Sequence, residues 1–351
     1  MKPILYPAGQ RVFDNNGYGV LSDCTECKAT EVLNGEYEIQ MTYPRTGNNA
    51  SYISVDTIVL IKSNYIDGPQ PFRIYNVEDN IDGVIQVKAA HLSYDTAGIP
   101  VSSMNVESLN DAMSAMNNNR ILSGDSEFIV VADFEAEGDM KTTEPKSFKS
   151  LLGDGENTLI GSYGGELHYD GYTIELHERR GEDKGICFRY RKNITEFQME
   201  STSEEVYTGV LGYWKKTGSN GAADVLVNGN IISAGIEASY EKILIVDTSD
   251  KIKNANDAAA TTEQIDDYIQ SYINENKPGN PKYNMKIEYT EDDNIIKINL
   301  GDTVAALIPE FGIKAYGRCT KVVYDCLLER NESIEVGTVD TGLAGDLANI
   351  I

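Results

Sequence analysis

Five cysteines and three histidines are the residues of this 351-residue chain whose chemistry suits metal binding or nucleophilic catalysis. Cys24 and Cys27 lie three residues apart in SDCTECKATEVLNGEYEIQMTYPR, a spacing that could form half of a zinc site. A structural zinc site takes four Cys or His ligands, usually as two close pairs. However, Cys319 and Cys326 are seven apart and Cys187 is isolated. On a strand, an odd spacing puts two side chains on opposite faces. The sequence therefore predicts buried free thiols, with no metal and no cofactor.

The histidines are His91, His168 and His177. The stretch HERRG at His177 begins like a zinc-protease helix motif but lacks the second histidine four residues later. His168 and His177 fall in two strands of one predicted hairpin. If the strands pair about an Asp170-Gly171 turn, His168 lies opposite Thr173, at a surface position. We therefore expect no zinc-protease site here.

Other catalytic arrangements are no clearer. A cysteine peptidase needs a thiolate at a helix start with a histidine in reach, and no cysteine clearly precedes a predicted helix. His91 with Cys24 or Cys27 is the one combination open to that interpretation. With 55 acidic residues, a carboxylate pair suited to glycoside cleavage arises by chance, and the sequence cannot single one out. We predict no catalytic residues.

The elements that carry these residues are mainly strands. Asn-Gly or Asp-Gly pairs recur between strand-like runs, at Asn34-Gly35, Asp82-Gly83, Asp170-Gly171 and Asn228-Gly229. Such pairs suit a two-residue type I′ hairpin, because both residues tolerate a positive φ. After the first pair, apolar side chains alternate with polar ones from Tyr37 to Tyr43, a period of two. The sequence therefore predicts antiparallel sheets in small barrels or sandwiches.

Three helices are predicted among the strands. In NVESLNDAMSAM, Leu109, Ala112, Met113 and Met116 form one apolar stripe. A second helix is expected in EPKSFKSLLG, ending at Gly153. The third has a stripe from Ile265 to Ile273, and Thr261 and Gln264 have the spacing of a capping box.

The fold class is therefore β-rich α+β with several domains. Residues 1–99 form a first β domain, residues 100–200 a mixed α+β domain, and residues 201–351 a second β domain with a helical insertion at about 251–282. The two β domains are expected to be small antiparallel barrels or sandwiches.

The net charge of the chain excludes some classes of binding partner. The formal net charge of −25 repels phosphate backbones and anionic lipid surfaces. No apolar run is long enough to span a membrane, and MKPILYPAGQR lacks the features of a signal peptide. We therefore expect no specific nucleic-acid binding, no membrane association and assembly in the cytoplasm.

Several stretches resemble the prophage tail proteins of the tail-endopeptidase or minor structural family, which are baseplate-hub or tail-tip proteins of long-tailed phages of Gram-positive bacteria. These stretches are ATEVLNGEYEIQMTYP, SYGGELHYDGYTIELHERRGEDKGICFRYRKNITEF, YTGVLGYW, YINENKPGNPK and the run from INLGDTVAALIPEF to NESIEVG. The residues that carry the resemblance are Asn34, Gly35, Tyr43, Pro44, Gly165, Glu166, Gly301, Asp302, Glu329 and Arg330. Asn331 departs from the family, where an aromatic residue is usual, and the chain stops at Ile351, near the end of the hub region.

The resemblance implies a structural role. The chain would be a homotrimeric hub ring at the virion tail tip, with residues 1–99 facing the tube. It would connect the tail-tube or distal tail protein and the tape-measure protein to receptor-binding or fibre proteins. DNA would pass through without specific binding. Two alternatives stay open: a cell-wall endopeptidase, after the family's name, and a carbohydrate-binding adhesin that uses aromatic residues such as those of SYGGELHYDGY.

Overall fold

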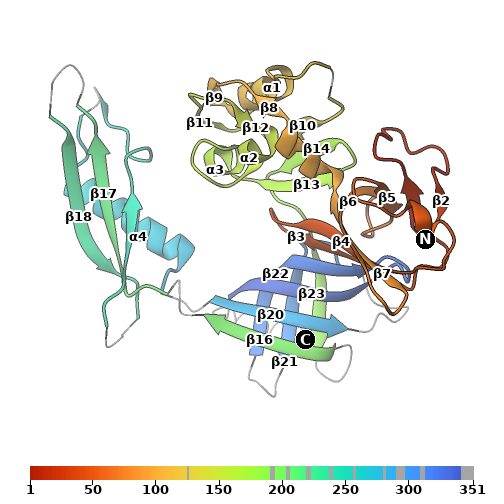
Figure 1. Cartoon of the computed structure of the whole chain (residues 1–351). Coiled ribbons are helices and arrows are strands. Elements are labelled where there is room, and N and C mark those ends of the chain that lie inside the picture. Colours follow the sequence, from red (N-terminus) through yellow and green to blue (C-terminus); the bar gives the residue numbers. More distant parts are fainter. Residues whose placement is uncertain are drawn as a thin grey trace. The chain divides into compact units, whose positions relative to one another are not determined.

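The computed structural model describes residues 1–124, 126–189, 194–202, 206–218, 223–236, 240–255, 258–279, 282–289, 297–308 and 313–340. The chain divides into two compact units, drawn in Figure 1. Unit 1 comprises Met1–Gln198 and Met285–Ile351, and unit 2 comprises Met199–Asn284. The segment predicted as the last domain, 201–351, is thus divided between both units. The finer division of the chain at residues 99 and 200 stays a prediction.

Unit 1 is built on a sheet of 13 strands. They are β1 Ile4–Tyr6, β2 Gly19–Val20, β3 Glu26–Val32, β4 Tyr37–Pro44, β5 Ile58–Ile61, β6 Gln70–Asp79, β7 Val84–His91, β15 Asp183–Arg189, β16 Ile194–Thr202, β20 Lys282–Tyr289, β21 Thr303–Ile308, β22 Ile313–Asp325 and β23 Arg330–Asp340. The order is β16-β20-β23-β22-β3-β4-β7-β6-β5-β1-β2, with β21 paired to β22 and β15 to β21. The N-terminal strands therefore join the C-terminal ones through the antiparallel pair β22 and β3.

The predicted alternation in β4 is confirmed. Tyr37, Ile39, Met41 and Tyr43 are buried, whereas the residues between them are partly or fully exposed. A strand with one buried face has its register fixed, because a slip by one residue would expose the whole apolar set. The β3–β4–β7 ladder is consequently a rigid support for the residues at its ends.

Two of the predicted turns have a different form. Asn34-Gly35 joins β3 to β4 and Asp82-Gly83 joins β6 to β7, as expected. Only Asn34 in the first pair and Gly83 in the second have a positive φ, of 55° and 84°. A type I′ turn needs positive φ at both central residues, so these turns are not of that type.

The rest of unit 1 contains short strands and helices. They are β8 Pro100–Val101, β9 Asn105–Ser108, α1 Leu109–Asn118, β10 Ile129–Ala132, β11 Glu137–Lys141, β12 Lys146–Ser147, α2 Phe148–Leu152, α3 Leu159–Tyr163, β13 Glu166–Asp170 and β14 Thr173–His177, besides 3₁₀ helices at Ala50–Tyr52 and Leu92–Gly98. Small sheets form as β8-β12, β9-β11 and β10-β14-β13. One apolar core, which includes Leu109, Phe148 and Ile174, joins these helices and sheets.

The first two predicted helices are confirmed in type and position. In α1 the buried residues are Leu109, Ala112 and Met116, and the Ser108 side chain caps the helix by accepting from the Asp111 N–H. The helix predicted in EPKSFKSLLG is only five residues long, starting after the cap Ser147. α3 had no predicted counterpart.

The described residues of unit 2 form a three-stranded sheet covered by one helix. The strands are β17 Gly209–Lys216, β18 Val225–Ser233 and β19 Ile243–Asp247, in the order β18-β17-β19, and the helix is α4 Thr262–Asn276. The predicted capping box of Thr261 and Gln264 is present at its start. The predicted turn at Asn228-Gly229 is wrong, because this pair lies inside β18 where the register shifts.

Close packing explains the glycine in that strand. A Cβ on Gly229 would come within 2.8 Å of Ile265, and one on Gly212 of β17 within 2.6 Å of Ile265 and Ile269. The two glycines let α4 approach the sheet closely, and Gly229 therefore marks helix packing.

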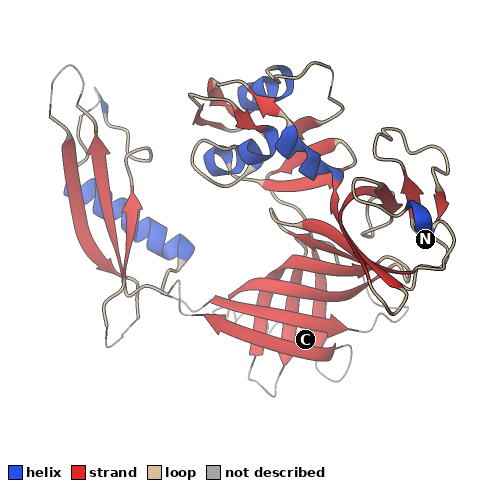
Figure 2. Cartoon of the chain, viewed as in Figure 1, coloured by secondary structure: helices blue, strands red, loops and turns tan. Residues whose placement is uncertain are grey.

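Strands dominate the chain, as Figure 2 shows, so the predicted β-rich class with antiparallel sheets is confirmed. The sheets formed by the described strands are open, so the expectation of closed barrels is wrong. The sandwich form, the other expectation for the two β domains, stays a prediction. None of the helices in the described residues combines the length and apolar character needed to cross a membrane.

Candidate functional site

Glu166, at the start of β13, holds two distant parts of unit 1 together. Its carboxylate accepts the Arg180 N–H at 2.7 Å and pairs with both terminal nitrogens of the Arg318 guanidinium, the Nη2 contact being 2.8 Å. Arg318 also donates to the carbonyls of Gly301 and Arg180, at 3.2 and 2.8 Å. Burial raises the pKa of Glu166, but the hydrogen bonds from Arg318 and from the Arg180 N–H, together with the charges of the two arginines, outweigh it and hold the pKa below its ordinary value.

Arg180 is the buried centre of this contact. Its guanidinium bonds to the Glu31 carboxylate at 2.9 Å and to the Leu167 carbonyl at 2.8 Å. Both charged side chains are more than nine-tenths buried. A buried charge without its partner is costly, so this ion pair fixes the position of β3 relative to β13.

Asp302 satisfies the backbone beside the arginines. Its carboxylate accepts the N–H groups of Glu182 and Asn299, each at 2.8 Å, and pairs with the Lys184 ammonium at 2.9 Å. Gly301 has a φ of +87°, and a Cβ there would lie 2.6 Å from the Arg180 carbonyl oxygen. Gly301 and Asp302 are therefore both needed where these two segments of the chain cross.

Asn34 completes the junction from the β3–β4 turn. Its side chain donates to the Gly165 carbonyl at 3.1 Å and accepts the Leu167 N–H at 2.8 Å. The amide acts here as one more strand partner for β13. We call the set of Asn34, Gly165, Glu166, Gly301 and Asp302, with Glu31, Arg180 and Arg318, the arginine junction.

The remaining residues of the predicted family motif are not part of this set. Gly35 is in the same turn as Asn34, whereas Tyr43 and Pro44 lie at the far end of β4. Glu329 and Arg330 lie at the β22–β23 turn, where Glu329 pairs with the N-terminal amine. Half of the ten predicted residues thus meet at one place, while their role as a motif stays a prediction.

Sequence reasoning missed the residues that bind this set. Glu31, Arg180 and Arg318 are far apart in the chain and no motif connects them. The sequence did hold one signal for these residues. In a strongly acidic chain, an arginine stands next to a glycine both in Arg180-Gly181 and in Gly317-Arg318.

Cys24 and Cys27 are not suited to act as nucleophiles. Cys24 lies before β3 rather than on it, so Cys24 and Cys27 do not alternate across the strand as we predicted, and both are buried. Burial raises the pKa of the Cys24 thiol to about 12. A hydrogen bond with the Cys326 thiol, together with burial, raises that of Cys27. Neutral thiols of this kind are poor nucleophiles.

His91 is a core residue. Its ring nitrogens bond to Ser93 at 3.0 Å and Gln70 at 3.2 Å, and it stacks on Tyr37. Burial lowers its pKa to about 3, so the ring is neutral. Both ring nitrogens are bonded to groups other than the thiols of Cys24 and Cys27.

His168 and His177 lie closer together than we predicted. The two-residue loop of this hairpin is Gly171-Tyr172, one residue later than expected, and His168 pairs with Glu175 instead of Thr173. His168 is also largely buried, with 12% of its side chain exposed. The predicted register and surface position of His168 are therefore wrong, and the two rings are 5.9 Å apart.

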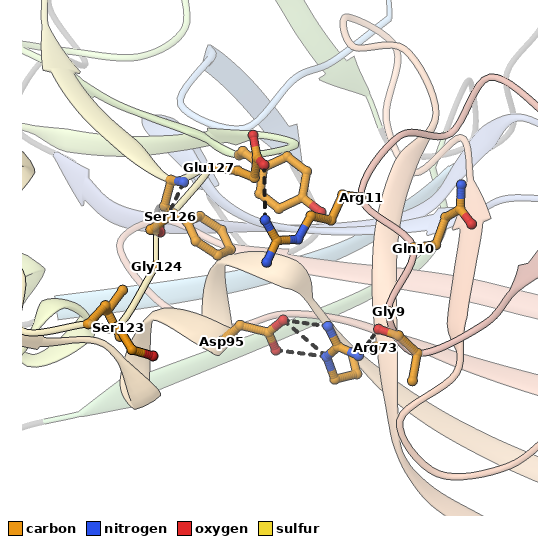
Figure 3. A pocket seen from close by; sticks show the side chains of 13 residues that line it. Gly9, Gln10, Arg11, Arg73, Asp95, Ser123, Gly124, Ser126 and Glu127 are labelled. Atoms are coloured by element: carbon orange, nitrogen blue, oxygen red, sulfur yellow. Dashed lines mark hydrogen bonds and ion pairs between the residues drawn. The ribbon is translucent and has the colours of Figure 1, made fainter.

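A groove of about 450 Å³ opens beside the N-terminal segment of unit 1, as Figure 3 shows. Its charged residues are already paired: Arg73 makes a two-point contact with Asp95, and Arg11 bonds to Glu127 at 3.3 Å. Arg73 is further bonded to the carbonyls of Ala8 and Asp56. These contacts join neighbouring loops and give the groove no strong charge to bind a ligand.

One family of known proteins matches part of the chain. Residues 182–344 match the family model described as "Prophage endopeptidase tail". No curated protein matches the chain. Gly301, Asp302, Glu329 and Arg330 lie inside the matched range, and the other predicted motif residues lie before it.

Solved structures share the fold over the whole chain. Prophage tail protein gp18 from Listeria monocytogenes EGD-e matches with a TM-score of 0.63 and 13% identity, covering 100% of this chain and 98% of that one. The 43 kDa tail protein of prophage MuSo2 from Shewanella oneidensis matches with a TM-score of 0.60 and 10% identity, covering 97% and 98%. A tail protein from Neisseria meningitidis MC58 matches with a TM-score of 0.60 and 9% identity, covering 97% of each chain. The family match over residues 182–344 and the fold shared with these tail proteins support the resemblance to prophage tail proteins that the sequence predicts.

Proposed function

We propose that the protein is a structural subunit of a phage tail tip, a hub ring that connects the tail tube to the host-recognition apparatus. The observation that carries the proposal is the fold shared over the full length with a prophage tail protein, together with the family match. The ring is a homotrimer. Its neighbours are the tail-tube or distal tail protein, the tape-measure protein and receptor-binding or fibre proteins, and it is assembled in the host cytoplasm.

The arginine junction supports a structural role. It brings together residues from β3, β13 and the segments around residues 180, 301 and 318 through buried and partly buried charged contacts. Such networks hold backbone segments in one arrangement, and removing one partner lowers the stability of the fold. A ring subunit that transmits force between tube and tip benefits from this rigidity.

Unit 2 offers a surface for assembly. Ile231, Leu211 and Ile245 are direct neighbours across its three strands, on the face opposite α4. Ile231 and Ile245 are 59% and 65% exposed, and Leu226 on the same face is 63% exposed. Clustered exposed apolar residues are typical of protein contact sites. We propose that this apolar face contacts a neighbouring subunit of the ring.

The net charge of −25 is compatible with a DNA passage. A negative surface does not bind phosphates through counterion release, so DNA can pass without being held.

An endopeptidase remains a second candidate, because the matched family carries that word in its description. The arrangement we considered from the sequence, His91 with Cys24 or Cys27, lacks a thiolate and an available imidazole nitrogen. The adhesin alternative relied on the aromatic residues of SYGGELHYDGY. Of these, Tyr163, Tyr169 and Tyr172 pack against the core of unit 1, which leaves less aromatic surface for stacking on a sugar.

Light scattering over a range of protein concentrations tests the ring. We expect a trimer, or a monomer that becomes a trimer as concentration rises, and weaker association in an Ile245→Asp variant. Ile81→Asp is the matched control, because Ile81 is fully exposed in the β6–β7 turn. A strict monomer at every concentration would contradict the trimer, and equal effects of both variants would remove the assignment of the apolar face.

A further inference from the structure

The small sheet β10-β14-β13 has one apolar face and one polar face. Ile174 and Leu176 of β14 are buried in the core of unit 1. Glu175 and His177 alternate with them and therefore lie on the other face, together with His168 of β13, which pairs with Glu175. The strand period thus gathers two imidazoles and a carboxylate on one surface.

The three side chains converge on one point. Glu175 Oε2 lies 2.9 Å from His168 Nδ1 and 3.2 Å from His177 Nε2. The three possible ligand atoms all lie within 4.8 Å of one another. Ligands about 2.1 Å from a tetrahedral ion are roughly 3.4 Å apart, so small movements of these side chains would give the separations of a coordination shell.

The outer nitrogen of each ring is bonded to another carboxylate. His168 Nε2 lies 3.0 Å from Asp67 Oδ2, and His177 Nδ1 lies 2.7 Å from Asp133 Oδ2. A metal-binding histidine almost always donates its second N–H to such a group, which fixes the tautomer and orients the ring.

The outer carboxylates are themselves held. Asn64 Nδ2 donates to Asp67 Oδ2 at 2.6 Å, and the Asp67 N–H donates to Asn64 Oδ1 at 2.8 Å. Asp133 Oδ1 accepts the Glu178 N–H at 3.2 Å. The loop before β6 and the end of β10 thus orient the two rings.

We propose that His168, Glu175 and His177 form a binding site for a divalent transition-metal ion of the zinc type. Two imidazole nitrogens and one carboxylate oxygen are suitable ligands for zinc, and Asp67 and Asp133 serve as the carboxylates behind the histidines. The ion lies between the three inner atoms and replaces the hydrogens that Glu175 otherwise accepts. His177 and Glu175 are 27% and 35% exposed, so the ion can enter from solvent and a water molecule can complete its shell.

A network of ion pairs alone is the competing interpretation. A protonated imidazole has two N–H donors, so two carboxylates per ring suit that network as well. The distinguishing feature is that one oxygen, Glu175 Oε2, faces the inner nitrogens of both rings. A cation placed between these three atoms would be bound by all of them at once, which favours the metal site. The inference goes beyond the hub proposal and does not depend on it.

Zinc binding to the purified full-length chain tests the site. The protein is dialysed against a chelator, and Zn²⁺ is titrated by calorimetry, with the bound metal counted by elemental analysis and Co²⁺ used as a spectroscopic substitute. We expect one ion per chain. Asp133→Asn should weaken binding about 10- to 100-fold, and His177→Gln by more than that.

The matched control is Glu178→Gln, the same acid-to-amide change on an exposed neighbour, which should bind like the parent. Circular dichroism before titration verifies that each variant is folded. Asp133 is half exposed, so the Asp133→Asn variant should fold even if a variant of the largely buried His168 fails to fold. The site is rejected if the parent binds no stoichiometric zinc, or if His177→Gln binds zinc as tightly as Glu178→Gln does.

Discussion

Glu31 and Arg180, which are 149 residues apart in the chain, form an ion pair of 2.9 Å inside unit 1. Arg180 belongs to the segment that leads from β14 to β15, and Glu31 lies on β3. The pair thus connects β3 with the segment after β14, where the Arg180 N–H bonds to Glu166 and Glu166 pairs with Arg318. The stability of unit 1 should depend on this contact.

Glu31→Ala should lower the free energy of unfolding by about 3–5 kcal/mol, because it leaves the Arg180 charge buried without its partner. The double variant Glu31→Leu with Arg180→Met should be more stable than the single variant, since it removes both charges. Denaturant titration measures these differences. Asp79→Asn, which breaks the exposed pair with Arg45, is the control and should have little effect. A Glu31→Ala variant as stable as the Asp79→Asn variant would contradict the assigned role.

His91 should make unit 1 sensitive to acid. Burial lowers its pKa to about 3, so below its ordinary pKa of 6.5 the unfolded chain binds a proton that the folded chain does not. Stability then rises with pH in this window and falls on acidification, by about 2 kcal/mol between pH 7 and pH 5. His91→Gln, which cannot be protonated, should lack that part of the slope. Unfolding curves at both pH values check this, and an unchanged slope in the variant would exclude His91 as its source.

Gly181→Ala tests the close crossing at the arginine junction. A Cβ on Gly181 would lie 2.1 Å from the Gly301 carbonyl carbon, and the residue has a φ of +75°. Gly83→Ala is the matched control, because Gly83 has a φ of +84° with no atom near its Cβ position. The control should lose about 1–2 kcal/mol from the left-handed backbone alone. Thermal unfolding should show a clearly larger loss for Gly181→Ala, and equal losses would mean that the crossing is not tight.

Thiol labelling tests the burial of the cysteines. Cys187 is exposed, and Cys24, Cys27, Cys319 and Cys326 are buried. A disulfide reagent should therefore modify one thiol quickly in the native protein and the other four only after denaturation. Cys187→Ser should abolish the fast phase. Two or more fast thiols would show that the sheet around β3 is more open than described.

The sequence predicted those features that depend on neighbouring residues. The stripe of α4 with its cap at Thr261, and the alternation along β4, follow from local periodicity and were correct. The arginine junction could not be predicted, because Glu31, Arg180 and Arg318 meet only through strand pairings across the chain.

The histidine cluster was missed for a more specific reason. We predicted a turn at Asp170-Gly171, but the loop is Gly171-Tyr172. Because of that shift, the residue opposite His168 is Glu175 instead of Thr173. His177 then lies diagonally across from His168 and contacts it. A one-residue error in turn position was thus enough to hide a candidate metal site.

The central claim, a structural place at the tail tip, is tested most directly by labelling tails. Antibodies against the protein, carried on gold particles, are applied to phage tails purified after prophage induction and viewed by electron microscopy. The account predicts label at the end of the tail that is distant from the head, on tails throughout the preparation. Label along the whole tube, or protein found only in fractions free of tails, would contradict it.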